Sequence, residues 1–198
     1  MLACTAFSTN VKSLSPYAVS KRTNELYARV FAQNFNMELI GLRYFNIFGP
    51  RQNPKGEYAA AIPVFMEALL KGQSPCINGD GEQSRDFTFV ENAVQANIRS
   101  MLTDNRNAVN QVYNIAFGEK YSVNLLFTIL KQLSGASVHA IHRDERMGDV
   151  RDSLADISLA RQMIGYNPMV SIQEGLSKTL SWFSGYFGYA PAPIRDKK

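Results

Sequence analysis

The sequence has few of the features that mark secreted, membrane-spanning or zinc-binding proteins. Cysteine occurs only at Cys4 and Cys76, in no paired motif, which argues against a disulfide framework or a zinc site and indicates a reducing compartment. No apolar run reaches the roughly 18 residues of a membrane span. The segment from Met1 to Phe7 lacks the basic start of a secretory signal. These absences predict a cytoplasmic protein without a membrane partner.

Charge is also sparse and evenly spread. The formal net charge of +4 is scattered along 198 residues, with no basic run except Lys197-Lys198, so we expect anionic small ligands rather than nucleic acid as partners. His139 and His142 lie two residues apart in an alternating apolar stretch, where we expect strand-surface positions and no metal site. The 45% hydrophobic fraction is enough for one compact body.

Hydrophobic periodicity predicts alternating helices and strands, hence an α/β fold. Residues 76–77 and 84–90 flank the turn sequence Asn78-Gly79-Asp80-Gly81, which predicts a hairpin or a pair of tight turns. The strand 38–45 reads as a buried parallel strand that ends at Asn46, and ligands of parallel sheets bind at such carboxyl ends. Helices are expected at 15–35, 61–70, 91–102, 123–133, 156–164 and 172–183, and strands at 38–45, 112–116 and 138–141.

The first helix places a tyrosine and a lysine one turn apart. Ser15 suits the N-cap and Pro16 the first helical position, so Tyr17 stands in the first turn and Lys21 lies on the same face. A neighbouring ammonium and the positive end of a helix both favour phenolate over phenol, which would make the tyrosine a base. Taken alone, this spacing favours an ordinary helix start with a solvated lysine, so the context has to decide.

The context is a set of segments in fixed order along the chain. They are Ser15-Pro16-Tyr17-Ala18-Val19-Ser20-Lys21, Leu42-Arg43-Tyr44-Phe45-Asn46-Ile47-Phe48-Gly49, Ile77-Asn78-Gly79-Asp80-Gly81, Ser84-Arg85-Asp86-Phe87 and Arg146-Met147-Gly148-Asp149-Val150-Arg151. With these segments the chain resembles the extended short-chain dehydrogenase/reductase family. Within that family it is similar to the NAD-dependent UDP-hexose 4-epimerases, above all to the bacterial UDP-N-acetylglucosamine 4-epimerases.

The resemblance implies the carboxyl-terminal part of an extended Rossmann-type NAD(P)-binding fold together with a smaller α/β substrate-binding domain. The amino-terminal dinucleotide-binding half is expected to be absent, because neither Gly-x-x-Gly-x-x-Gly nor Gly-x-Gly-x-x-Gly occurs in the sequence. The family's catalytic serine or threonine upstream of the tyrosine also has no counterpart. We expect a non-family segment at 1–13, the Rossmann remnant at 14–60, a mainly UDP-sugar-binding portion at 61–189 and a mobile tail at 190–198.

The resemblance also implies roles for single residues. Tyr17 would take the proton of the sugar 4-hydroxyl, and Lys21 would bind the nicotinamide ribose and favour the phenolate. Phe45 would contact the nicotinamide. The remaining expected contacts are to UDP-sugar: Asn46, Arg85 and Arg146 to the diphosphate, Asp149 to the uridine ribose, the backbone around Asn78 to uracil, Gln52 and Ser153 to an N-acetyl group, and Tyr58 to the sugar.

Each of these residues also has an ordinary structural interpretation. Asn46 could cap a strand end, and Arg85 could form a salt bridge with Asp86 or Glu91. As an ordered set they favour a nucleotide-sugar site.

The resemblance implies interconversion of UDP-N-acetylglucosamine and UDP-N-acetylgalactosamine, or of UDP-glucose and UDP-galactose, by transient oxidation with bound NAD in the intact form. The present chain is expected to be inactive and not to retain NAD by itself. A homodimer through the helix at 15–35 is a further expectation. Two alternatives stay open: a non-catalytic UDP-sugar-binding or structural remnant, and a fragment of a nucleotide-sugar dehydratase or decarboxylase.

Overall fold

The computed structural model describes residues 16–55, 60–145 and 151–188, and it confirms the α/β class. Six helices, one short 3-10 turn and eight short strands are found in these ranges. The helices are α1 (Pro16–Phe35), α2 (Ala61–Leu70), α3 (Val90–Met101), α4 (Val123–Ser134), α5 (Ser158–Ile164) and α6 (Ile172–Phe187), with η1 at Arg106–Ala108. The strands are β1 (Ile40–Tyr44), β2 (Ile47–Phe48), β3 (Cys76–Asn78), β4 (Ser84–Arg85), β5 (Thr88–Phe89), β6 (Gln111–Ile115), β7 (Tyr121–Ser122) and β8 (Ile141–Arg143).

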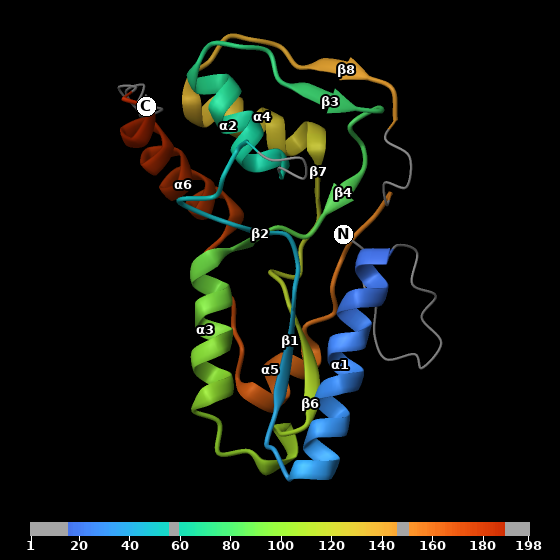
Figure 1. The fold of residues 1–198 in the computed structure, drawn as a ribbon. Coiled ribbons are helices and arrows are strands. Elements are labelled where there is room, and N and C mark those ends of the chain that lie inside the picture. The colour runs from blue at the N-terminus through green and yellow to red at the C-terminus, as the bar shows by residue number, and fades with distance from the viewer. Residues whose placement is uncertain (1–15, 56–59, 146–150, 189–198) are drawn as a thin grey trace.

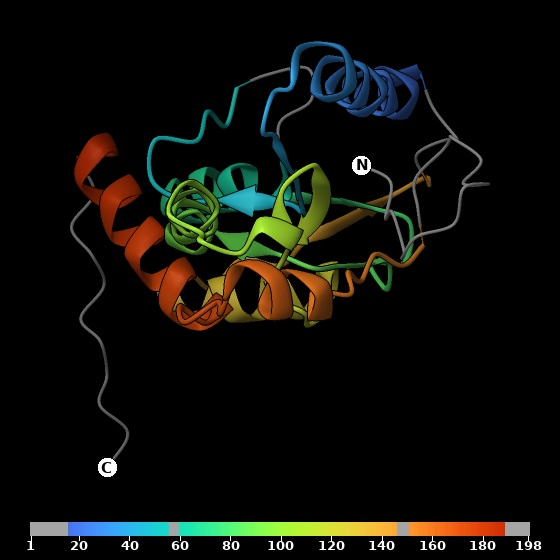
Figure 2. The ribbon, with the colours of Figure 1, turned by 90° about the horizontal axis from the view of Figure 1, so that it is seen from below.

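The strands pair two by two rather than in one continuous sheet. β1 runs parallel to β6, with Ile40 opposite Gln111 and Tyr44 opposite Ile115. β2 pairs in parallel with β5 and β3 with β8, whereas β4 and β7 are antiparallel. The expected parallel strand before Asn46 is therefore confirmed, although it is not fully buried: Ile40 to Arg43 are half-buried and Tyr44 is exposed. In Figure 2, α1 lies on one side of the β1–β6 pair and α5 on the other.

Two apolar clusters hold the described chain together. The first lies in the upper part of Figure 1, where α2, α4 and α6 pack together with β3 and β5. Gly175 of α6 allows a close approach there, because a Cβ at this position would stand 2.8 Å from the Phe89 ring and 2.9 Å from Phe48. The second cluster joins Phe45 to β6 and α5. The second cluster contains residues from both of the expected domain ranges, 14–60 and 61–189. The division into these domains stays a prediction.

Local sequence explains where the longer helices begin and end. The Ser122 hydroxyl accepts from the Leu125 amide at 3.1 Å at the start of α4, and Ser171 does the same for Glu174 at 3.3 Å at the start of α6. Both helices end at glycines in the left-handed region, Gly135 and Gly188, with φ of 68° and 70°.

Several sequence expectations need correction. The hairpin alternative at residues 76–90 is wrong, because β3 pairs with β8 and β4 with β7; the glycines of the turn, Gly79 and Gly81, adopt φ of 69° and 77°, as the tight-turn alternative requires. The strand expected at 138–141 lies at Ile141–Arg143, where its register with β3 places it. The closing helix continues past residue 183 to Phe187, since Phe183 and Phe187 contact each other at 5.7 Å between ring centroids. The tail at 190–198 lies outside the described residues.

Candidate functional site

The expected base and its lysine stand at the start of α1. Lys21 Nζ lies 5.1 Å from the centroid of the Tyr17 ring, so the phenol and the ammonium share one face, as the spacing predicted. Tyr17 is 54% exposed and is therefore accessible to a ligand. The Ser20 hydroxyl donates to the Tyr17 carbonyl at 2.7 Å within the same turn.

An ion pair fixes α1 on the sheet. Arg43 of β1 donates to both carboxylate oxygens of Glu25, at 2.6 and 2.7 Å, and both side chains are about one-fifth exposed. Burial alone raises the pKa of Glu25, but hydrogen bonds and charge from Arg43 and Arg22 bring it below its usual value. The helix that carries Tyr17 is thus tied to the strand that leads to Asn46.

Asn46 stands at the carboxyl end of β1, between β1 and β2. It adopts the left-handed region with φ of 40°, which asparagine tolerates better than most residues. Its side-chain Nδ2 donates to the Asp86 carbonyl at 2.8 Å, and its own carbonyl accepts from the Thr88 amide at 3.3 Å. The Asn46 side chain therefore points toward Asp86, the residue that directly follows Arg85 of β4.

Arg85 and Ser153 belong to two segments that are joined by main-chain hydrogen bonds. Ser84, beside Arg85 in β4, donates its amide to the Arg151 carbonyl at 2.8 Å and accepts from the Ser153 amide at 3.1 Å. Ser153 is buried, at 2% exposure, while Arg85 is half-buried. Asn46, Arg85 and Ser153, which are far apart in the sequence, are thus neighbours through Ser84 and Asp86.

Asp86 carries a buried carboxylate, and the only individual role expected for it from the sequence was a salt bridge with Arg85. It is fully buried and accepts main-chain hydrogen bonds from Phe117 at 3.1 Å, from Gly118 at 3.1 Å and from Ala155 at 3.4 Å. Burial raises its pKa to about 6, against the lowering effect of these three amides. Glu91, the other partner considered for Arg85, forms an ion pair with Lys178 at 2.9 Å. In the sequence, only the position of Asp86 next to Arg85 indicated that Asp86 lies at the candidate site.

The structure places the other expected residues in different surroundings. Phe45 is 5% exposed and belongs to the second core cluster, so its contact with a nicotinamide stays a prediction. Gln52 donates to the Ile47 carbonyl at 3.3 Å, while its Oε1 is buried with no partner among the described residues. Asn78 is exposed at the end of β3. Tyr58, Arg146 and Asp149 lie outside the described residues.

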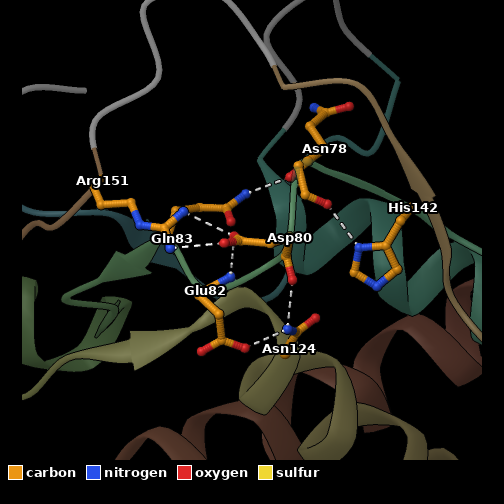
Figure 3. Close-up of polar contacts among 8 residues, drawn as sticks. Asn78, Asp80, Glu82, Gln83, Asn124, His142 and Arg151 are labelled. Atoms are coloured by element: carbon orange, nitrogen blue, oxygen red, sulfur yellow. Dashed lines mark hydrogen bonds and ion pairs between the residues drawn. The ribbon is translucent and has the colours of Figure 1, made fainter.

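The turn after β3 is braced by polar contacts (Figure 3). Arg151 donates to both oxygens of Asp80, at 2.9 and 2.8 Å, and these contacts hold the pKa of Asp80 below its usual value. Asn124 of α4 donates to the Asp80 carbonyl at 2.8 Å and to the Glu82 carboxylate at 2.7 Å. His142, on the exposed strand surface as expected, has its Nδ1 2.8 Å from the Gly79 carbonyl oxygen.

A cavity of about 720 Å³ is lined by none of the expected site residues. Phe117, Gly118, Ala155 and Arg161 are among its walls. Within the described ranges no group of three or more His, Cys, Asp or Glu side chains could hold a metal ion. None of the helices in these ranges has the length and apolar character needed to cross a bilayer.

Comparison with known proteins decides the family. Residues 4–116, more than half of the chain, match the model of the NAD dependent epimerase/dehydratase family. The chain belongs to this family. The match begins inside the segment 1–13. The family includes NAD in its description, and Tyr17 with Lys21 on the exposed face of α1 are a suitable donor pair for the ribose end of that cofactor.

Solved and curated relatives agree with this family and with a Rossmann-like α/β fold. The UDP-N-acetylglucosamine 4-epimerase of Methanobrevibacter ruminantium, in complex with UDP-N-acetylmuramic acid, is 42% identical with a TM-score of 0.84, over 90% of this chain and 56% of its own. The UDP-glucuronic acid 4-epimerase of Bacillus cereus, with UDP-glucuronic acid and NAD, is 30% identical with a TM-score of 0.83, over 91% and 57%.

A UDP-glucose 4-epimerase of Mycolicibacterium smegmatis is 34% identical over 173 residues, which are 87% of this chain and 54% of that protein. The chain spans about half the length of the curated relatives it matches.

Proposed function

We propose that this chain is the UDP-sugar-binding portion of a nucleotide-sugar 4-epimerase, with UDP-N-acetylglucosamine or UDP-glucose as substrate. The observation that carries the proposal is the gathering of Asn46 and Arg85 at the carboxyl end of β1, where the Asn46 amide donates to the main chain of the residue after Arg85 at 2.8 Å. An amide and a guanidinium at the end of a parallel strand suit a diphosphate. The relatives in complex with UDP-sugars support the choice of nucleotide.

The catalytic roles rest on α1. Tyr17 accepts the proton of the sugar 4-hydroxyl, and Lys21, on the same face of the helix, binds the nicotinamide ribose. NAD, when bound, supplies the hydride acceptor at the sugar carbon and returns the hydride. The Glu25–Arg43 pair joins the middle of α1 to β1.

The 198 residues by themselves are proposed to retain no NAD, because the sequence has no glycine-rich turn for its pyrophosphate. Protein purified without added cofactor should show no NAD absorbance after denaturation and no turnover of UDP-N-acetylglucosamine. If co-expression with the amino-terminal half of a relative restores turnover and Tyr17→Phe removes it, Tyr17 is the base.

UDP-sugar binding is the direct test of the proposal. Calorimetry with UDP-N-acetylglucosamine should detect weak binding that falls with added salt, because guanidinium and diphosphate attract each other. Arg85→Ala should weaken binding by about 1.5–3 kcal/mol, the range for a hydrogen bond to a charged group. Arg99→Ala, which removes an exposed cation from α3, is the matched control and should change little. Folded protein that shows no binding at millimolar UDP-sugar would contradict the proposal and favour a structural role.

A further inference from the structure

Asp86 connects four segments that are distant in the sequence. Its main-chain carbonyl accepts from Asn46, which follows β1. Its carboxylate accepts from the amides of Phe117 and Gly118, which follow β6, and from Ala155, which precedes α5. Asp86 itself directly follows Arg85, the last residue of β4.

The two residues proposed to bind the diphosphate therefore both depend on Asp86. Arg85 is its covalent neighbour, and the side chain of Asn46 ends on its carbonyl. On the basis of the proposed function, we propose that Asp86 is a positioning residue of the UDP-sugar site: its carbonyl orients the Asn46 amide, and its carboxylate holds the main chain that carries Arg85 against the segments after β6 and before α5.

The charge state of Asp86 should control this arrangement. A carboxylate offers acceptor lone pairs on both oxygens to the three amides, whereas a carboxylic acid places a hydrogen on one of them and loses acceptor capacity. Burial raises the pKa of Asp86 to about 6. The contacts should therefore weaken as the pH falls from 7.5 to 5.5.

The charged and titratable groups around Asp86 come from several elements. Glu119, after β6, raises the pKa of Asp86 further by its negative charge. Tyr121 of β7 and Tyr166, after α5, also feel the Asp86 charge, and burial raises the pKa of both phenols, so both are neutral in this range. Arg85, the adjacent residue of β4, is positively charged throughout. Asp86, with a pKa of about 6, changes charge within the range from pH 7.5 to 5.5.

The first experiment needs no ligand. In the 198-residue chain, the NMR signals of the Phe117, Gly118 and Ala155 amides and of the Asn46 side-chain amide should titrate together with a midpoint near pH 6. In Asp86→Asn the four signals should stay still over the same range. Signals that do not move, or that move with unrelated midpoints, would overturn the proposal whether or not the chain binds a UDP-sugar.

The second experiment links Asp86 to binding. UDP-N-acetylglucosamine is the probe, because its diphosphate has no terminal phosphate that titrates near pH 6. The affinity of the wild-type chain should fall about tenfold from pH 7.5 to 5.5, which corresponds to about 1.4 kcal/mol. Asp86→Asn should bind weakly at both values, and Asp104→Asn, which changes an exposed carboxylate between α3 and η1, should keep the wild-type profile.

The outcomes separate the two proposals. An affinity of the wild-type chain that is independent of pH, or an Asp86→Asn variant with the wild-type profile, would contradict the positioning role while leaving UDP-sugar binding intact. No binding at any pH would contradict the proposed function, and the NMR titration would then still decide whether Asp86 holds Asn46 and the adjoining segments.

Discussion

A fully buried carboxylate such as Asp86 makes stability depend on pH in an unusual direction. Because burial raises its pKa from 3.8 to about 6, the folded state favours the protonated form. The stability that Asp86 contributes is therefore fully present below about pH 4 and is lost as the pH rises through 6, by about 3 kcal/mol at 1.36 kcal/mol per pH unit. A charge that destabilises the fold at neutral pH is consistent with a role in the site rather than in stability.

Urea unfolding at several pH values tests this sign. The free energy of unfolding of Asp86→Asn, relative to wild type, should rise between pH 4 and 7, because only the wild type loses stability through Asp86 in that range. Carboxylates with lowered pKa values, such as Glu25, act in the opposite direction at lower pH, but they are present in both proteins and cancel in the difference. A difference that does not vary with pH would show that burial does not raise the pKa of Asp86.

Among the elements, α1 depends on one contact more than on packing. No residue of α1 is buried, whereas Glu25 forms two hydrogen bonds with Arg43 of β1. Glu25→Gln should weaken the attachment of α1 by about 1.5–3 kcal/mol, the range for hydrogen bonds to charged groups. Hydrogen exchange should then show faster exchange in α1 with β1 and β6 unchanged.

Glu38→Gln is the matched control for Glu25→Gln. Glu38 pairs with Arg106, but its side chain is 65% exposed and that of Arg106 is 80% exposed, so solvent screens the pair. Exchange in α1 should be unaffected by this change. Equal exchange rates in wild type and Glu25→Gln would mean that contacts other than Arg43 hold the helix.

The elements also show what sequence alone can predict. The bounds of α2 follow from an apolar run stopped by Lys71 and Gly72, and the tyrosine–lysine face of α1 follows from helical spacing. The strands β2, β4, β5 and β7 have two residues each, too few to show any periodicity. The contacts of Asp86 could not be predicted either, because its donors come from residues 117, 118 and 155, which only the tertiary fold brings together.

For the whole molecule, the exposed apolar surface of α1 is the feature that bears most on association with other chains. Leu26, Tyr27, Val30, Phe31 and Phe35 are between 44% and 65% exposed, and Phe31 contacts Phe35 at 5.3 Å between ring centroids. Contiguous apolar surface of this kind marks sites of association. Within the described ranges β1 and β6 form a two-stranded sheet, with no third strand that would cover this surface.

We therefore expect the isolated chain to self-associate through α1, as a homodimer or a larger species. Tyr27→Glu combined with Phe31→Glu places two charges on this surface and should shift the chain to the monomer in size-exclusion chromatography with light scattering, since burying an unpaired charge is costly. Met169→Glu changes an apolar side chain that is 75% exposed outside α1, and it should leave the size distribution as in wild type. A wild-type chain that is monomeric and unfolds in one sharp thermal transition would contradict the expectation, because the α1 surface would then be stable in water without a partner.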